Sequence, residues 1–223
     1  QRLLVERRDP SARDVLPMQV RGGRTPQGRM HAMYALDGLG QLEPDDVMHG
    51  LSDESDGVRV HALRLADLWL DQETALLDRV IAMIDDVHPR VRLQVALSLG
   101  ESRQPRVVDA LAQLAATHGD ERWMSAAIVS SISPVADAFL ARLLAARLSG
   151  AGALTVVGAA AETIGAQGDE SRLGNCLQQA AKLAGPDAAS RQRAVLEGLV
   201  RGLGRGKLQA VQSEQSVRGL ELL

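Results

Sequence analysis

The sequence has few cysteines and few aromatic residues. Cys176 is the one cysteine among 223 residues, which excludes an internal disulfide framework and any cysteine-rich zinc or iron–sulfur site. Aromatic residues make up 2% of the chain, too few for the stacking platforms on which many proteins bind bases. No apolar run is expected to approach the roughly 20 residues that a membrane-spanning helix needs.

The remaining composition is that of a globular protein with a weak net charge. Hydrophobic residues account for 45% of the chain and charged residues for 24%, which allows a packed core and excludes a disordered chain. The formal net charge of −3 argues against a general nucleic-acid binder, because such proteins carry a surplus of basic residues. The chain begins at Gln1 in what resembles the end of a helix, so we expect a fragment of a longer protein.

Four segments share one pattern, in which a motif similar to Val-Arg-x-x-Ala opens an amphipathic stretch. They begin at residues 28, 58, 91 and 123, so their spacings are 30, 33 and 32 residues. A short break and a second apolar stretch follow, for example over residues 73–84 and 106–117, with apolar residues at helical spacing. The pattern predicts paired helices and no strands.

Paired helices that repeat at this period stack into an α-solenoid, because one pair alone cannot bury its apolar face. We therefore predict an all-α fold, a right-handed superhelix of about six or seven stacked antiparallel helix pairs, with the second helices lining the inner face. We expect a single repeat domain over residues 1–223, with regular repeats at about 27–149 and less regular repeats at 150–223.

The repeated motif, preceded by an acidic turn and often a proline, resembles HEAT-like repeats of the armadillo-like and PBS-lyase kind. Residues 29–40 and 58–67 together resemble the HEAT segment of large exported bacterial proteins of the planctomycete and verrucomicrobial type, labelled membrane-bound dehydrogenases. In that family a sugar-dehydrogenase-like propeller precedes the segment and a haem-binding module commonly follows. The resemblance implies an exported or periplasmic scaffold. The present sequence has no Cys-x-x-Cys-His motif, so it attaches no c-type haem itself.

Arginines occupy the second position of the repeated motif, and two interpretations compete for them. A row of guanidinium groups could bind an acidic partner. Alternatively, each arginine bonds a carboxylate or a carbonyl group in the preceding turn and ties neighbouring repeats together. We favour the second interpretation. The arginines are Arg29, Arg59 and Arg92, and the candidate acidic partners are Asp53, Asp56 and Asp85.

Partner binding is predicted at exposed positions of the second helices. Two aspartates recur at one outward position of successive second helices, with a basic and a polar residue near them. Trp69 lies near a predicted helix end, and tryptophan is frequent at binding hot spots. By contrast, Trp123 takes the position that valine occupies in other repeats and is expected in the core. The predicted partner-binding residues are Asp78, Arg79, Asp109, Gln113 and Trp69.

Two histidines and the cysteine are candidates for metal binding or covalent chemistry. His31 and His61 are equivalent in the repeat and could form a metal pair, but packed helix axes lie about 8–10 Å apart and no third ligand stands at a clear spacing. We favour hydrogen-bonded packing histidines and expect no metal or cofactor. Cys176 could be a nucleophile or a bilin-attachment thiol, because HEAT-like repeats also occur in phycobiliprotein lyases. A buried, unreactive thiol is favoured, because Cys176 lies inside an apolar helical pattern.

Towards the C-terminus, a run of glycines and a group of basic residues are interpreted as structural features, not as binding sites. The glycines match no phosphate-binding fingerprint and are interpreted as helix termination. The basic residues could contact phosphate or an acidic protein, but a solvated helix face is favoured. The glycines are Gly198, Gly202, Gly204 and Gly206, and the basic residues are Arg191, Arg193, Arg201, Arg205 and Lys207.

The predicted function is a non-catalytic scaffold. It would offer an extended surface to a protein partner or act as a rigid spacer between modules of the same polypeptide, with no cofactor, no nucleic acid and no membrane contact. Two alternatives stay open. One is a HEAT-like enzyme of the bilin-lyase kind, which needs a reactive thiol or an acid–base pair. The other is a HEAT protein that binds nucleic acid through arginines.

Overall fold

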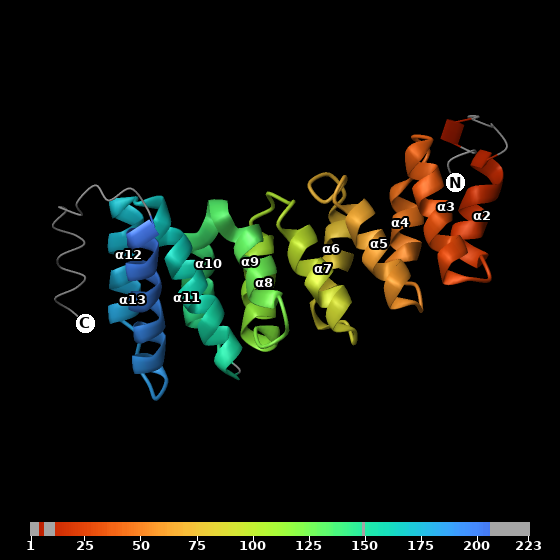
Figure 1. Cartoon of the computed structure of the whole chain (residues 1–223). Helices are drawn as coiled ribbons and strands as arrows, with labels where there is room; N and C mark the ends of the chain where they lie inside the picture. Colours follow the sequence, from red (N-terminus) through yellow and green to blue (C-terminus); the bar gives the residue numbers. More distant parts are fainter. Residues whose placement is uncertain (1–4, 7–11, 149, 206–223) are drawn as a thin grey trace. The chain divides into compact units, whose positions relative to one another are not determined.

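The computed structural model describes residues 5–6, 12–148 and 150–205, and all regular elements in those ranges are helical. The chain divides into two compact units, Gln1–Gln104 and Pro105–Leu223. Figure 1 shows the helices in chain order. Within each unit, helices stack in two layers, so the predicted all-α solenoid fold is confirmed. The right-handed sense of the superhelix stays a prediction.

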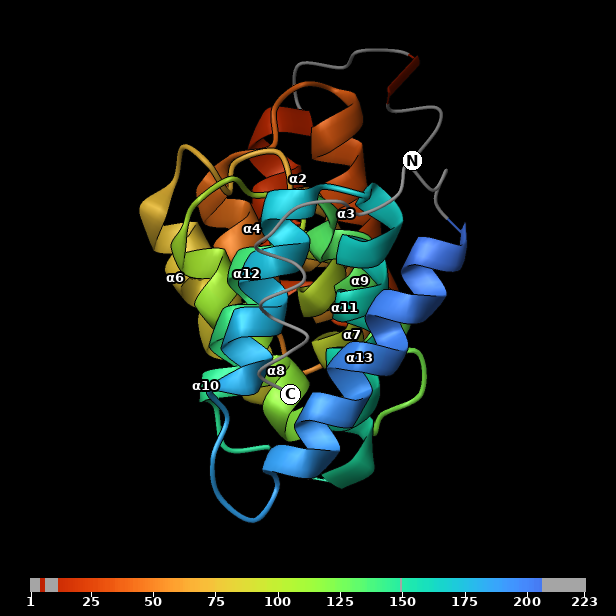
Figure 2. The ribbon, with the colours of Figure 1, turned by 90° about the vertical axis from the view of Figure 1, so that its left-hand side faces the viewer.

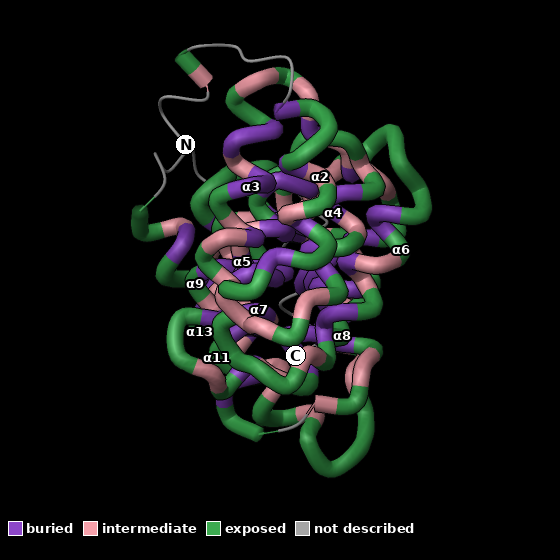
Figure 3. Tube along the Cα trace, turned by 90° about the vertical axis from the view of Figure 1, so that its right-hand side faces the viewer, coloured by how far each residue is buried: buried purple, intermediate pink, exposed green. Residues whose placement is uncertain are grey.

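The first unit has one layer of first helices and one layer of second helices. Its elements are α2 (Ala12–Gly22), α3 (Pro26–Gly38), α4 (Pro44–Gly50), α5 (Asp56–Ala66), α6 (Thr74–Ala82), the 3-10 helix η1 (Met83–Asp85) and α7 (Pro89–Leu99). First helices α3, α5 and α7 pack in succession, and second helices α2, α4 and α6 form the other layer. Figure 3 shows buried stretches within these helices and exposed turns between them.

Local sequence signals set the beginnings of these helices. Pro26, Pro44 and Pro89 each stand at the start of a helix, where a missing N–H group removes no intrahelical bond. The Thr25 hydroxyl caps α3 by accepting a hydrogen bond from the Gly28 N–H group at 3.1 Å. The predicted starts near residues 28, 58 and 91 therefore coincide with α3, α5 and α7.

The second unit repeats the two-layer arrangement. Its elements are α8 (Arg106–His118), α9 (Met124–Ile132), the 3-10 helix η2 (Ser133–Val135), α10 (Ala136–Ala145), α11 (Gly150–Gln167), α12 (Glu170–Ala181) and α13 (Ala188–Arg205). First helices α9, α11 and α13 pack in succession, as do second helices α8, α10 and α12. Figure 2 shows α11 beside α13, with α10 and α12 in the other layer.

Helices α11 and α13 approach each other so closely that side chains would not fit between them. A Cβ atom at Gly198 would overlap the carbonyl oxygen of Gly158, and one at Gly202 would overlap the carbonyl oxygen of Glu162. Both glycines lie inside α13, which continues to Arg205. The interpretation of this glycine run as helix termination is therefore wrong for Gly198 and Gly202, because these residues serve close packing.

Some predicted features fall elsewhere or outside the described residues. Helix α2 was not predicted, since it carries Pro17 in its interior, which disfavours a helix. Gly206, Lys207, the stretch 208–223 and most of residues 1–8 lie outside the described part of the chain.

One described stretch, Met124–Ala145, is long and apolar enough to cross a membrane by composition, with a mean hydropathy of 1.5 over its best window. This corrects the expectation that no such run exists, and the reason is that Asp137 and Arg142 are its only charged residues. In the structure the stretch forms α9, η2 and α10, and 44% of that window is buried in the protein.

Candidate functional site

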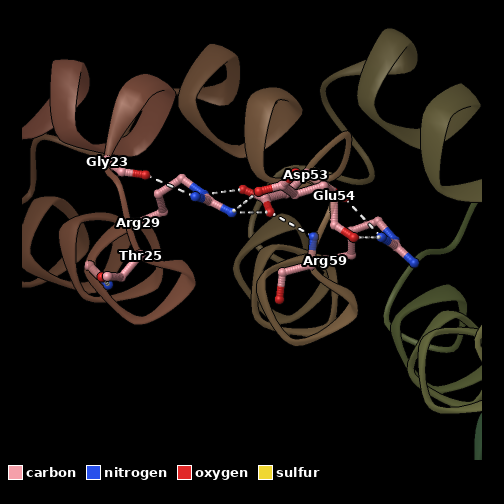
Figure 4. A network of polar contacts seen from close by, with 8 residues as sticks. Gly23, Thr25, Arg29, Asp53, Glu54 and Arg59 are labelled. Carbon is pink, nitrogen blue, oxygen red and sulfur yellow. Dashed lines mark hydrogen bonds and ion pairs between the residues drawn. The ribbon is translucent and has the colours of Figure 1, made fainter.

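A network of polar contacts in the first unit joins α3 to the turn after α4 (Figure 4). The Arg29 guanidinium binds both carboxylate oxygens of Asp53, with Nε–Oδ2 at 2.6 Å and Nη2–Oδ1 at 2.7 Å. Its Nη1 donates to the carbonyl oxygen of Gly23 at 2.8 Å, and the residue is 8% exposed. Bidentate, charge-assisted bonds of this length are among the strongest hydrogen bonds in proteins. Arg29 therefore fastens one repeat to the next.

Arg59 repeats this arrangement one repeat further along. Its Nε and Nη2 each lie 2.9 Å from an oxygen of the Asp86 carboxylate, and its Nη1 donates to the carbonyl oxygen of Asp53 at 2.8 Å. Arg92 donates in turn to the carbonyl oxygen of Asp86. In all three cases this carbonyl belongs to the residue six positions before the arginine. We call Arg29, Arg59 and Arg92, with these acceptors, the arginine ladder.

The carboxylates of Asp53 and Asp86 also accept hydrogen bonds from backbone N–H groups just before α5 and α7. An oxygen of Asp53 accepts from the Ser55 N–H group at 2.8 Å, and an oxygen of Asp86 accepts from the His88 N–H group at 2.9 Å. Burial acts to raise the pKa of each carboxyl group. The bonds from the arginines and from these N–H groups outweigh burial and hold both pKa values below the ordinary range. The ladder therefore stabilises the fold with its aspartates ionised, and this contribution is lost on acidification.

The structure corrects where the ladder carboxylates come from. The preceding turn was expected to supply a carboxylate or a carbonyl group. It supplies the carbonyl groups, as predicted, but the carboxylates that bond Arg29 and Arg59 come from the following turn. Arg59 bonds Asp86, which was not among the candidates. The other two candidate aspartates lie at helix ends. Asp56 is the first residue of α5, and Asp85 is the last residue of η1.

The predicted partner-binding residues of the first unit have different surroundings. Asp78 is exposed on α6. Its neighbour Arg79 is half-buried, and its Nη2 donates to the carbonyl oxygen of Leu51, after the end of α4, at 2.9 Å. Arg79 thus takes part in the packing of α6 against α4, and its role in partner binding stays a prediction. Trp69 is half-buried in the turn after α5.

In the second unit, the predicted residues Asp109 and Gln113 are both exposed on α8. The Asp109 carboxylate lies 2.9 Å from Nε of Arg142 on α10, and the two side chains are 62% and 64% exposed. An ion pair this exposed contributes little to stability. It does show that neighbouring second helices present polar groups on one common surface.

Polar side chains also join the first helices α3 and α5. The Tyr34 hydroxyl lies 2.9 Å from Nδ1 of His61, and the two rings meet edge to face at 5.5 Å. Burial lowers the pKa of His61, and the positive charges of Arg64 and Arg90 act in the same direction. His61 is therefore a hydrogen-bonded packing histidine, as the sequence predicts. Among the described residues, no group of three or more His, Cys, Asp or Glu is placed to hold a metal ion.

Asp67, at the end of α5, has a strongly raised pKa. Burial raises its pKa to about 6; Glu101 adds to this effect, and Ser98 and Arg64 oppose it. Its buried Oδ1 has no hydrogen-bond partner among the described residues. Nothing in the sequence distinguishes Asp67, because one aspartate at the end of a helix forms no recognisable pattern.

Cys176 is 3% exposed within α12, which confirms the predicted burial of the thiol. Burial raises the pKa of the thiol to about 12. A small cavity of about 130 Å³ lies beside it between α10 and α12. Because the thiolate is the reactive form, this surrounding gives an unreactive thiol at neutral pH.

Trp123 lies on the surface, and its prediction as a core residue is wrong. It is 63% exposed, and its φ of 70° lies in the left-handed region. Val58 and Val91 are the third residues of α5 and α7, whereas Trp123 precedes α9. The sequence positions are thus not structurally equivalent, and the indole leaves the packed face. It lines an open groove of about 700 Å³ between α9 and α11, which we call the Trp123 groove.

Most of the described basic residues of α13 bind groups of the same unit. Arg191 Nη1 donates to the carbonyl oxygens of Leu144 and Ala146, at 2.9 and 3.2 Å. Arg201 and Arg205 both pair with the Glu162 carboxylate on α11. Arg193 is exposed.

Comparison with protein families supports the repeat architecture. A family model described as HEAT repeats matches residues 44–133, which extend from the start of α4 to the start of η2. No curated protein and no solved structure matches the chain. The matched range contains the pair of Arg59 and Asp86 from the arginine ladder. Residues 44–133 are thus similar to HEAT repeats, and they lie within an all-α solenoid fold.

Proposed function

We propose that the chain is a non-catalytic HEAT-repeat scaffold, which offers a protein partner an extended surface or acts as a rigid spacer between neighbouring modules of the same polypeptide. The observation that supports this most is the exposed face of α8 and α10. Asp109 and Arg142 come from successive second helices and meet on this face. A surface built from several repeats suits an extended partner, because each solenoid repeat adds a strip to it.

The polar bonds inside the structure join neighbouring repeats, and this favours a rigid scaffold over an enzyme. The arginine ladder and Arg79 join neighbouring repeats. The bilin-lyase alternative needs a reactive thiol, and the buried Cys176 with its raised pKa disfavours it. The nucleic-acid alternative needs a surplus of basic residues, and the formal net charge of −3 disfavours it.

The resemblance of residues 29–67 extends this proposal to a place within a longer chain. The segment would be the spacer of an exported redox protein, with the redox chemistry in other modules. The ladder residues Arg29, Asp53 and Arg59 lie within this stretch. Their bonds would keep such modules at a fixed separation.

The test places a photoreactive amino acid at Gln113 in the full chain, within extracts of cells that naturally make the protein. We expect one discrete cross-linked species, either to a partner protein or to a neighbouring module. It should be lost in the Asp109→Lys variant, whose melting temperature should stay unchanged because Asp109 is exposed.

The matched control is Asp187→Lys, an exposed aspartate in the same unit but in the turn before α13. This variant should keep the cross-link. A cross-link that survives Asp109→Lys, or that a photoreactive residue at Asp187 reproduces, would contradict the proposed surface.

A further inference from the structure

We propose that the Trp123 groove is a docking site for an acidic, amphipathic peptide segment of another protein. The groove lies between first helices α9 and α11 and uses none of the exposed residues of α8 and α10. The proposal rests on the proposed function only in requiring a protein partner. Its surface and its test are separate.

The groove has a shape that suits a short apolar segment. Trp123, Ala126 and Val129 line one side, and Ala159, Thr163 and Ala166 line the other. Helix α9, which runs along it, has nine residues and is therefore about 13 Å long. Near one end of α9, Gln167 Nε2 donates to the carbonyl oxygen of Ser133 at 2.8 Å and bridges the two sides. Trp123 stands at the opposite end of α9.

Trp123 is held in an unfavourable backbone conformation, and its indole remains in water. A φ of 70° is rare for a bulky residue, because the Cβ atom crowds the backbone. The indole is 63% exposed, and the Arg122 guanidinium lies 5.3 Å from its ring centroid. Strained residues of this kind cluster at binding sites. Exposed tryptophans are also frequent at the centre of protein interfaces.

The charges around the groove select an acidic partner. On the α11 side, Glu162 is the one lining carboxylate among the described residues, and both Arg201 and Arg205 pair with it. Arg205 remains 74% exposed. At the Trp123 end, Arg122 is preceded by Asp120 and Glu121, so this end carries no surplus of positive charge. On the α11 side, two guanidinium groups share one carboxylate, and acidic residues on the partner would meet unbalanced positive charge there.

The experiment selects short peptides from a random display library against the immobilised full chain. Peptides retained by the Trp123→Gly variant are removed, because glycine accepts a positive φ and deletes the indole. We expect the enriched peptides to carry Asp or Glu around large apolar residues at helical spacing. Their binding should weaken about tenfold or more in Arg205→Glu, a variant that the selection does not use.

Two further variants keep the test interpretable. Ala166→Glu changes an exposed residue of the groove and should weaken acidic peptides by charge repulsion, without loss of folding. Val200→Ala is the matched control, because Val200 is 68% exposed on α13 and does not line the groove. In a Trp69→Phe background, Trp123 is the only tryptophan, so its emission should shift to the blue as a peptide covers it.

Several outcomes would overturn the proposal. They are the enrichment of basic or uncharged peptides, equal binding to Ala166→Glu, and no enrichment at all. Phosphatidylcholine–phosphatidylglycerol vesicles could also shift the Trp123 emission to the blue. If the peptides do not reverse that shift, the surface would be assigned to membranes instead. The Asp109→Lys variant separates the two proposals. It should lose the Gln113 cross-link of the scaffold surface but keep peptide binding in the Trp123 groove.

Discussion

Replacing Arg59 with methionine should destabilise the first unit by about 3–5 kcal/mol, because it leaves a buried carboxylate without its counter-ion. The side chains of Arg59 and Asp86 are 10% and 11% exposed. The same substitution removes the donor to the carbonyl oxygens of Asp53 and Glu54, which lie 2.8 and 3.1 Å from Nη1. Methionine keeps most of the apolar contact, so the loss measures the polar bonds.

The contribution of the ion pair itself follows from a double-mutant cycle with Asp86→Asn. Asparagine still offers an oxygen to the His88 N–H group, so this single variant should lose less than Arg59→Met. We expect a coupling energy of about 1.5–3 kcal/mol between the two sites. Arg142→Met is the matched control, since its ion pair with Asp109 is more than 60% exposed on both sides and should contribute less than about 1 kcal/mol.

Urea titration followed by fluorescence measures both units in one sample, since Trp69 lies in the first unit and Trp123 in the second. Single-tryptophan backgrounds, Trp123→Phe and Trp69→Phe, separate the two signals. Equal losses for Arg59→Met and Arg142→Met would refute the reasoning. Additive effects of Arg59→Met and Asp86→Asn would refute it as well.

Three further predictions concern a carboxyl group, a helix contact and the thiol. The folded pKa of Asp67 is raised from 3.8 to about 6, so the stability associated with its protonated form is lost as pH rises through about 6. Asp67→Asn should therefore stabilise the first unit by about 1–2 kcal/mol near pH 7.5, after a discount for partial solvation, and by about 1 kcal/mol less near pH 4.5. An equal gain at both pH values in urea titrations would contradict this. Gly202→Ala should lower stability by about 1–3 kcal/mol through overlap with α11, whereas Gly204→Ala, with open space around it, should be neutral or stabilising by up to about 1 kcal/mol; equal thermal melts would contradict this. Cys176 should resist a thiol reagent in the native protein and react fully in urea, and rapid native labelling would reopen the enzyme alternative.

The ladder shows what the sequence determined and where it was ambiguous. The repeat of Arg29, Arg59 and Arg92 predicted bonds between repeats, because a guanidinium at a recurrent buried position needs acceptors. The sequence does not show whether the carboxylate comes from the turn before or after, since both lie next to the arginine in a stack. The six-residue spacing from Asp53 to Arg59 and from Asp86 to Arg92 was available as a signal for the carbonyl bonds.

The second unit was less predictable, because its determinants are steric. Trp123 aligned with valines in the sequence, but the helix start is shifted and the side chain lies on the surface. Glycines inside α13 resemble helix ends, since glycine weakens an isolated helix. Their packing role depends on α11, which lies about forty residues earlier in the chain, and this pairing leaves no local pattern.

The two units therefore hold neighbouring repeats together by different physical means. In the first unit, ionised aspartates accept paired bonds from buried arginines, so this attachment depends on carboxylate ionisation. In the second unit, Asp120 accepts from the Gly152 N–H group at 2.5 Å, and glycines bring the α11 and α13 backbones into contact. This second attachment depends on the absence of side chains, and it uses no buried arginine pair like that of Arg59 and Asp86 among the described residues. The ion pairs of Arg201 and Arg205 with Glu162 join the same two helices at an exposed edge, and the Arg205 side chain stays 74% exposed there, beside the Trp123 groove, where it can meet an acidic partner.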